Sequence, residues 1–294
     1  MVLVVNSRGR NRLVELVEQG SIGAFQLVDA ACLLLDDDGN MQGICQHIKY
    51  FDETDSTNNQ AKLAAEKDAQ DGTLFVAECQ TGGRGRRGRT WVSPAGSGIW
   101  MSLLLRPHIS PESASMLTLV LAVAMVEAIN EEVKDAKCYV KWPNDIVLNS
   151  KKISGTLTEM SAEIDAIHYV VIGIGINVNT TDFDESIKDM ATSIYLETGT
   201  KVKRSSIIAA FSKSFKKYYE AFLETEDLTL LIDRYNELLI NKGRTVKAIY
   251  ANKELIGEAL GINKDGELII KTEDGASVAI RAGEVSVRGL YGYV

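Results

Sequence analysis

The chain has 294 residues, a net charge of -8 at pH 7 and 45% hydrophobic residues, which suffices for one large domain and a smaller one. The four cysteines are widely spaced and form no C-x-x-C pair, so neither a disulfide framework nor a cysteine zinc site is indicated, and a reducing cytoplasm is favoured. Three histidines without an H-E-x-x-H pattern argue against a histidine metal site, and the longest apolar stretch, 116–129, is too short to span a bilayer.

Residues 1–46 are predicted to be a short structural extension. They hold six acidic residues against three arginines, whereas a module that binds duplex DNA needs a basic face to neutralise phosphates. The run Asp36-Asp37-Asp38-Gly39-Asn40 is typical of a solvated turn between two strands. A degenerate DNA-binding domain stays open as the alternative.

Strands and helices are then expected in turn over 47–240. Ser56 or Thr57 is expected to cap a helix that ends near Gly72. Trp100 and Met101 fit a pocket wall and a core position equally well. Apolar runs predict strands over 47–52, 73–78, 99–105, 138–140, 156–160 (after a turn at 151–155) and 170–179, and helical spacing predicts helices over 112–133, 205–224 and 227–240.

The character of the chain changes after Gly243. Short strands are predicted over 245–250, 254–261, 267–272 and 277–280, with turns at 263–266 and 273–275. This pattern indicates a small barrel-like domain of about 50 residues. Its size favours a docking or lid element over a catalytic one.

A loop of twelve residues, 80–91, is the most unusual stretch of the chain. Its glycines let backbone N–H groups approach a ligand, and each guanidinium offers a fork of donors that suits phosphate or carboxylate. Because the like charges repel one another, we expect a loop that is mobile when empty and ordered by a polyanion. The loop holds Gly82, Gly83, Gly85 and Gly88, and Arg84, Arg86, Arg87 and Arg89.

Two nucleotide-binding patterns also fit this loop, a dinucleotide fingerprint at 83–88 and a P-loop over 83–90. Both require a helix after the last glycine, but Pro94, Gly96 and Gly98 follow and favour an extended or turning chain. Nonspecific RNA contact is a further alternative, which the acidic chain disfavours.

The residues alone leave the role of other positions open as well. Lys141 fits a surface cation or a functional one, Gly173 a kink in a sheet, and Ser56 a plain helix cap.

Five motifs in one order, over about 125 residues, resemble those of the biotin protein ligases. They are Asp55-Ser56-Thr57-Asn58, the arginine loop with Ser93-Pro94 and 99–107, Lys141-Trp142-Pro143-Asn144-Asp145, Lys152-Ile153-Ser154-Gly155, and Gly173-Ile174-Gly175-Ile176-Asn177. The resemblance implies an α+β fold. A catalytic domain at 47–240, with a mixed β-sheet and helices like a class II synthetase, is followed by a small SH3-like β-barrel at 241–294. Many members also carry an N-terminal helix-turn-helix, which 1–46 does not show in complete form.

The resemblance implies a site for biotin, ATP and Mg²⁺, with no metal ligand assigned. Lys141, Arg86 and Asp145 are the implied catalytic residues. The lysine binds the biotin carboxylate and then the acyl phosphate, Arg86 contacts the adenylate phosphate, and Asp145 could orient Lys141, the incoming amine or a Mg²⁺ ion. The implied binding residues are Ser56, Thr57 and Asn58 at the ureido ring of biotin, Asn177 near the ribose, Trp91 near the adenine, and Gln80, Gly83, Arg84, Gly85, Arg86, Arg87, Arg89, Lys141, Asn144, Gly155, Gly173 and Gly175.

The implied activity is that of an ATP-dependent ligase. It forms biotinyl-5′-AMP and transfers biotin to a lysine of a biotin carboxyl carrier domain, in acetyl-CoA carboxylase or a related carboxylase. A cytoplasmic homodimer without a membrane or nucleic-acid partner is expected. The rival interpretations are a lipoate ligase, a biotin-sensing repressor and a nucleotide-binding redox enzyme.

Overall fold

The computed structural model describes residues 2–4, 43–45, 47–250, 253–282, 285–289 and 293–294. The turn predicted at 36–40 and most of the predicted extension 1–46 lie outside these residues. Strand β1 (Val2–Val4) is described, and it pairs antiparallel with β2 at the edge of the large sheet.

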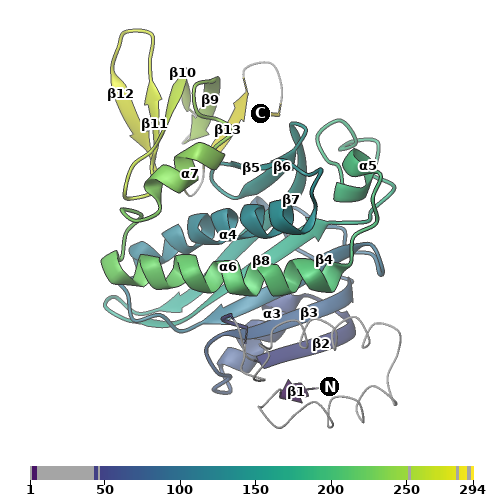
Figure 1. Cartoon of the computed structure of the whole chain (residues 1–294). Coiled ribbons are helices and arrows are strands. Elements are labelled where there is room, and N and C mark those ends of the chain that lie inside the picture. Colours follow the sequence, from purple (N-terminus) through teal and green to yellow (C-terminus); the bar gives the residue numbers. More distant parts are fainter. Residues whose placement is uncertain (1, 5–42, 46, 251–252, 283–284, 290–292) are drawn as a thin grey trace.

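An eight-stranded mixed sheet forms the large domain (Figure 1). Its order is β1-β2-β3-β4-β8-β7-β6-β5, with β2 and β3 parallel and the other neighbours antiparallel. The predicted mixed-sheet α+β fold is therefore confirmed. The strands after β1 are β2 (His47–Thr54), β3 (Thr73–Gln80), β4 (Gly98–Leu105), β5 (Cys138–Lys141), β6 (Asp145–Leu148), β7 (Lys151–Ala162) and β8 (Ile167–Asn177).

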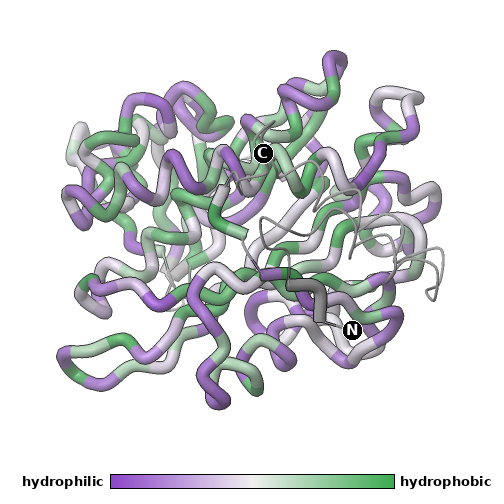
Figure 2. The backbone as a smooth tube through the Cα atoms, turned by 60° about the horizontal axis from the view of Figure 1, so that its bottom comes forward, coloured by the Kyte–Doolittle hydropathy of each residue, from purple (hydrophilic) through white to green (hydrophobic). Residues whose placement is uncertain are grey.

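Helices cover both faces of this sheet. On one face, α4 (Leu117–Glu132), preceded by the 3₁₀ turn η2 (Ser113–Met116), packs against the sheet and against α6 (Arg204–Thr225). The other face carries α3 (Thr57–Ala65) and a smaller apolar cluster. Hydrophobic residues accordingly gather toward the middle of the molecule, while hydrophilic residues mark many of its outer turns (Figure 2).

Strand β4 separates the two faces by its alternation. Met101 joins the core under α4, whereas Ser102 reaches α3, because successive side chains of a strand point to opposite sides. Met101 is therefore a core residue. Trp100 is also fully buried, and its indole N–H donates to the Pro94 carbonyl oxygen.

The long apolar helix required a correction. The stretch Ser113–Glu132 is long and apolar enough to cross a membrane, contrary to the sequence estimate from 116–129. Most of α4 is fully buried against the sheet and α6, however, so the structure uses it as a core helix. Its burial, and not its length, argues for that role.

Three other element predictions were wrong in their bounds, and one helix was missed. The helix expected to end near Gly72 is α3, which ends at Ala65. The turn expected at 151–155 lies instead at Asn149 and Ser150, which both have positive φ, and β7 begins at Lys151. The second C-terminal helix, expected over 227–240, is only α7 (Ile232–Leu238). The short α5 (Ile194–Thr198), capped by the Ser193 side chain, was not predicted.

The C-terminal domain is an antiparallel five-stranded sheet of order β12-β11-β10-β9-β13, as expected for a small barrel. Its fifth strand, β13, was not predicted. The domain lies at the β5–β6 end of the large sheet, with α7 at the junction (Figure 1). The strands are β9 (Thr245–Tyr250), β10 (Lys253–Ile262), β11 (Leu268–Lys271), β12 (Ser277–Ile280) and β13 (Ser286–Gly289).

Trp142 joins the two domains. It is fully buried, its indole N–H donates to the Gly266 carbonyl oxygen at 3.0 Å, and its backbone N–H donates to Asn241 Oδ1 at 3.0 Å. Because Trp142 follows Lys141 directly, the docking of the small domain fixes the chain next to this lysine.

Candidate active site

The start of α3 forms one end of the site. Asn58 is buried, and its amide donates to Glu159 Oε2 at 2.7 Å while its Oδ1 accepts from Ser102 at 2.6 Å. A Cβ on Gly173 would lie 2.1 Å from Asn58 Oδ1. The pairing of β8 with both neighbours runs through Gly173 without a register shift, so this glycine makes room for Asn58 and is not a kink.

Glu159 holds this end together by charge. Lys62 pairs with it at 2.6 Å, and the Arg84 guanidinium lies 4.0 Å away. Burial by itself raises the pKa of Glu159, but the hydrogen bonds from Lys62 and Asn58 outweigh it and hold the pKa below its ordinary value. Glu159 therefore stays ionised, and it links α3 to the arginine loop. The sequence reasoning missed this residue, because its strand carried no motif there.

Gln80 connects the helix start to the loop. Its Oε1 accepts from the Thr57 backbone N–H at 2.8 Å, and its Nε2 donates to Ser93 Oγ at 2.9 Å. Ser56 is buried at the N-cap of α3, although its side chain makes no capping hydrogen bond. The predicted residues of the first motif and Gln80 thus come together in the structure.

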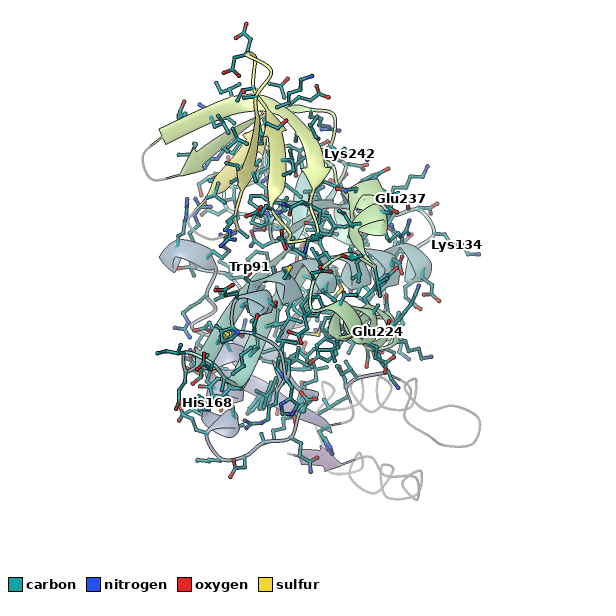
Figure 3. The ribbon with its side chains drawn as sticks, turned by 90° about the vertical axis from the view of Figure 1, so that its left-hand side faces the viewer. Trp91, Lys134, His168, Glu224, Glu237 and Lys242 are labelled. Carbon is teal, nitrogen blue, oxygen red and sulfur yellow. The ribbon has the colours of Figure 1, made fainter. Side chains whose placement is uncertain are left out.

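Trp91 lies on a floor made by two glycines. A Cβ on Gly175 would lie 2.4 Å from Trp91 Nε1, and one on Gly155 would lie 3.3 Å from the same indole. Figure 3 shows Trp91 near the junction of the two domains, on the side of the sheet away from Glu224 of α6. The indole N–H is buried and has no partner among the described residues, as expected of a donor that serves a ligand.

The arginine loop folds back over the large sheet. It has no long helix, as predicted, only the 3₁₀ turn η1 (Arg86–Gly88) and a bridge between Arg84 and Thr90. Gly83 is buried, and a Cβ there would lie 2.3 Å from the Trp91 carbonyl oxygen. The Gly85 backbone N–H donates to the Arg89 carbonyl oxygen at 2.7 Å.

The four arginines have different surroundings. Arg86 is half-buried and donates to Asn144 Oδ1 at 2.7 Å, and burial lowers its pKa. Arg84 donates to Asn59 at the start of α3. Arg87, which has positive φ, and Arg89 are exposed. Arg86 is therefore the arginine that the structure brings against the Lys141 hairpin.

Lys141 and Asp145 face each other across the β5–β6 hairpin. Lys141 is 5% exposed, and burial lowers its pKa to about 8, against the opposing charge of Asp145. Burial alone raises the pKa of Asp145, but the charges of Lys152 and Lys141 outweigh it and lower the pKa. The hairpin thus holds a desolvated cation beside an ionised carboxylate, an arrangement typical of functional sites.

Two neighbours of this pair were not predicted as site residues. Lys152 pairs with Asp145 Oδ1 at 2.5 Å and lies 5.3 Å from the Trp91 ring centre. Tyr293, near the C-terminus, donates to Asp145 Oδ2 at 2.5 Å. Lys152 belongs to one of the five sequence motifs. Nothing in the sequence around Tyr293 predicts a contact with Asp145, which lies 148 residues earlier in the chain.

Asn177 lies two residues after Gly175, on the same face of β8. It is buried at the end of β8, and its amide donates to the Thr192 carbonyl oxygen at 3.2 Å. The described residues contain no group of three or more His, Cys, Asp or Glu side chains that could hold a metal ion. Asp145 Oδ1 forms an ion pair with Lys152 and Oδ2 accepts a hydrogen bond from Tyr293, so the structure shows Asp145 orienting its neighbours.

Comparison with known proteins supports the family resemblance. Residues 50–177 match the biotin/lipoate A/B protein ligase family, and residues 243–288 match the biotin protein ligase C-terminal domain. The bifunctional ligase/repressor BirA of Bacillus subtilis is 42% identical over 232 residues, which cover 78% of this chain and 71% of that protein. The chain belongs to the biotin protein ligase family. It is therefore a ligase enzyme.

Further relatives cover more of the chain. BirA of Escherichia coli is 33% identical over 264 residues, 90% of this chain and 79% of that protein. The structure of the biotin protein ligase from Aquifex aeolicus in complex with biotin and ATP has a TM-score of 0.72 and 32% identity, covering 82% of this chain and 98% of its own. This likeness confirms the family fold of both domains.

Proposed function

We propose that the protein is an ATP-dependent biotin protein ligase that works in two steps. In the first, an oxygen of the biotin carboxylate attacks the α-phosphorus of ATP, and pyrophosphate leaves with the electron pair of the broken P–O bond. In the second, a lysine amine of a biotin carboxyl carrier domain attacks the acyl carbon. An amide forms, AMP leaves, and the amine gives up a proton.

One observation carries the proposal. Arg86 reaches from the arginine loop to Asn144, in the hairpin that holds Lys141. Two buried or half-buried cations thus come from distant segments to one place, next to a glycine floor. The first step brings two anions together, so desolvated cations aimed at the developing charge are what it requires.

The two ends of the site fit the two ends of the intermediate. Asn58, Thr57 and Gln80 offer fixed polar groups for the ureido ring, and Gly155 and Gly175 let the Trp91 indole lie close to the sheet, where it can line the nucleotide end of the site. We place the acyl phosphate between Arg86 and Lys141. ATP brings Mg²⁺ with its phosphates, where the ion would neutralise charge on the leaving pyrophosphate.

The loop also protects the intermediate. The adenylate is a mixed anhydride that water hydrolyses, and a loop that closes over it keeps water out until the carrier lysine arrives. The hydrogen bond from Gly85 to Arg89 closes a turn within the loop, and the one from Arg86 to Asn144 supports such a closed position by joining the loop to the Lys141 hairpin.

The names of the relatives support the choice of partner. A relative from Paracoccus denitrificans, named a biotin–[acetyl-CoA-carboxylase] ligase, is 33% identical and is covered over 98% of its length. A carboxylase carrier domain is therefore the partner that we propose. We also propose a cytoplasmic location and a homodimer, with domains at 1–46, 47–240 and 241–294.

The decisive experiment is mass spectrometry of a purified carrier domain after incubation with the protein, biotin, ATP and Mg²⁺. One added biotin on the carrier lysine is expected. A carrier with that lysine replaced by arginine should gain none, and neither should the reaction without ATP. A parallel arm with lipoate and a lipoyl carrier domain tests the rival, and lipoylation without biotinylation would overturn the proposal.

A repressor activity is a second candidate, because the BirA relatives are named ligase/repressors. The acidic balance of residues 1–46 speaks against it. A gel shift with a biotin operon operator tests it directly. A shift that requires biotin and ATP would establish this second activity beside the ligase.

A further inference from the structure

A tyrosine from the far end of the chain lies in the reaction centre. The Tyr293 hydroxyl donates to Asp145 Oδ2 at 2.5 Å, and Lys141 Nζ lies 4.1 Å from the centre of the Tyr293 ring. The small domain thus contributes a side chain that touches both charged groups of the β5–β6 hairpin.

The two oxygens of Asp145 are both occupied. Lys152 pairs with Oδ1 at 2.5 Å, and Tyr293 binds Oδ2. Each oxygen of the carboxylate thus has one protein partner, and these two partners come from opposite domains. Asp145 stays ionised, but among the described residues its ion pair is with Lys152 and its hydrogen bond is with Tyr293, and it forms no salt bridge with Lys141.

Lys141 therefore keeps its charge without an ion pair. Its ammonium donates to the Val287 carbonyl oxygen at 3.0 Å and lies over the Tyr293 ring, and it forms no salt bridge with any residue that the structure describes. A carbonyl and an aromatic face stabilise a cation but do not neutralise it. An unpaired, desolvated cation attracts a substrate anion more strongly than one already paired.

We propose that Tyr293 is a positioning residue for the transfer chemistry, which holds Asp145 by its hydroxyl and covers Lys141 by its ring, so that the lysine charge is kept for the substrate anion. The proposal rests on the proposed function, since it assumes that Lys141 faces the reacting carboxylate and phosphate. It also gives the small domain a part in the chemistry, through β13 and the residue near the chain end.

The test uses Tyr293→Phe, which keeps the ring and removes the hydroxyl. Asp145 Oδ2 is then free to turn to Lys141, and the pairing weakens stabilisation of the developing charge more than it weakens binding. With carrier domain present to take up the biotinyl group, we expect kcat for pyrophosphate release from biotin and ATP to fall at least about tenfold, with KM for biotin changed less than about threefold. Deleting Tyr293 and Val294 should cost at least as much, because the ring is lost too.

A matched control comes from α6. The Tyr218 hydroxyl also donates to a carboxylate, Glu127 Oε1 at 2.5 Å, far from the site. Tyr218→Phe removes an equivalent hydrogen bond and should leave kcat unchanged. Equal melting temperatures of the two variants would show that any difference in kcat is not a loss of folded protein.

A double-mutant cycle with Asp145→Asn separates positioning from mere packing. If Tyr293 acts through the carboxylate, Tyr293→Phe lowers kcat little further in an enzyme that already carries Asp145→Asn, because the effects of coupled residues are not additive. Additive losses, or a Tyr293→Phe enzyme with wild-type kcat, would overturn the proposal. A wild-type protein that releases no pyrophosphate would instead overturn the proposed function, and this inference with it.

Discussion

At the residue scale, the site depends on charges held away from water. Lys141 is the most buried of these cations. The opposite charge nearby is Asp145, which is hydrogen-bonded to Tyr293, and the like charges nearby are Lys152, Arg288 and Arg86. Burial disfavours the charged form of a lysine, and this explains its lowered pKa. The same desolvation strengthens its attraction for an anion.

The pH dependence of catalysis follows from this lysine. With a pKa of about 8, Lys141 is charged below pH 8 and neutral above it. We expect kcat/KM for biotin to fall about tenfold per pH unit above that value, because kcat/KM reports the free enzyme. Steady-state pyrophosphate release between pH 6.5 and 10 measures this limb.

Stability has the opposite sign for this group. The unfolded chain holds the lysine proton up to the ordinary pKa of 10.5, so the unfavourable contribution of Lys141 to the folded state is present in full below pH 8 and is relieved as pH rises from 8 to 10.5. A fall in kcat/KM between pH 8 and 10.5 without a lower melting temperature is therefore assigned to deprotonation of Lys141 and not to unfolding. A flat profile through pH 9 would contradict the role assigned to it.

Arg86 should determine how well the intermediate is retained. Arg86→Ala removes the hydrogen bond to Asn144 and the cation nearest to the hairpin, so adenylate should leave the site before transfer. Biotinyl-5′-AMP in the filtrate of a reaction without carrier measures the leak. Arg281→Ala, an exposed arginine of the small domain that pairs with Glu267, is the matched control and should retain as much as wild type.

At the scale of elements, β8 shows how one strand serves two faces. Ile172, Ile174 and Ile176 join the core under α4, while Gly173 and Gly175 face Asn58 and Trp91. The alternation puts glycine wherever the site approaches the backbone. The strand thus carries the core and the ligand floor at the same time.

Gly173→Ala tests this division. The new Cβ would lie 2.1 Å from Asn58 Oδ1, so the Asn58 amide must move away from Glu159 and Ser102. We expect biotin to bind at least about tenfold more weakly, roughly 1.4 kcal/mol, in isothermal titration. Ile172→Val on the opposite face should cost about 1 kcal/mol of unfolding free energy and leave biotin affinity unchanged.

At the scale of the whole molecule, the two domains meet where the chemistry is proposed. Trp142 binds the small domain from the hairpin, and Val287 and Tyr293 reach back from it to Lys141 and Asp145. The small domain therefore contributes groups to the candidate site, and its expected part as a docking or lid element stays a prediction.

Trp142→Phe should loosen this junction. The substitution removes the indole hydrogen bond to the buried junction at Gly266, and we expect a loss of about 1–3 kcal/mol in the free energy of unfolding by urea. Tyr139→Phe, in the preceding strand β5 but exposed, should change stability by less than about 0.5 kcal/mol. Equal effects of the two variants would show that the junction does not depend on this contact.

The sequence by itself determined the family, the order of most elements and most of the residues of the candidate site. These rest on local patterns, namely apolar periodicity, turn residues and five motifs whose spacing is visible in the chain. The arginine loop and the Lys141 hairpin were found for this reason, and so were Asn58 and the strand glycines.

Only the tertiary structure decided which of these residues meet and what else joins them. It selected Arg86 from four arginines, brought Glu159 to Asn58, and placed Tyr293 on Asp145. Such contacts join segments far apart in the chain, and their geometry follows from sheet order and domain packing, which no local pattern encodes. The lowered pKa of Lys141 has the same origin, because burial is a property of the folded molecule.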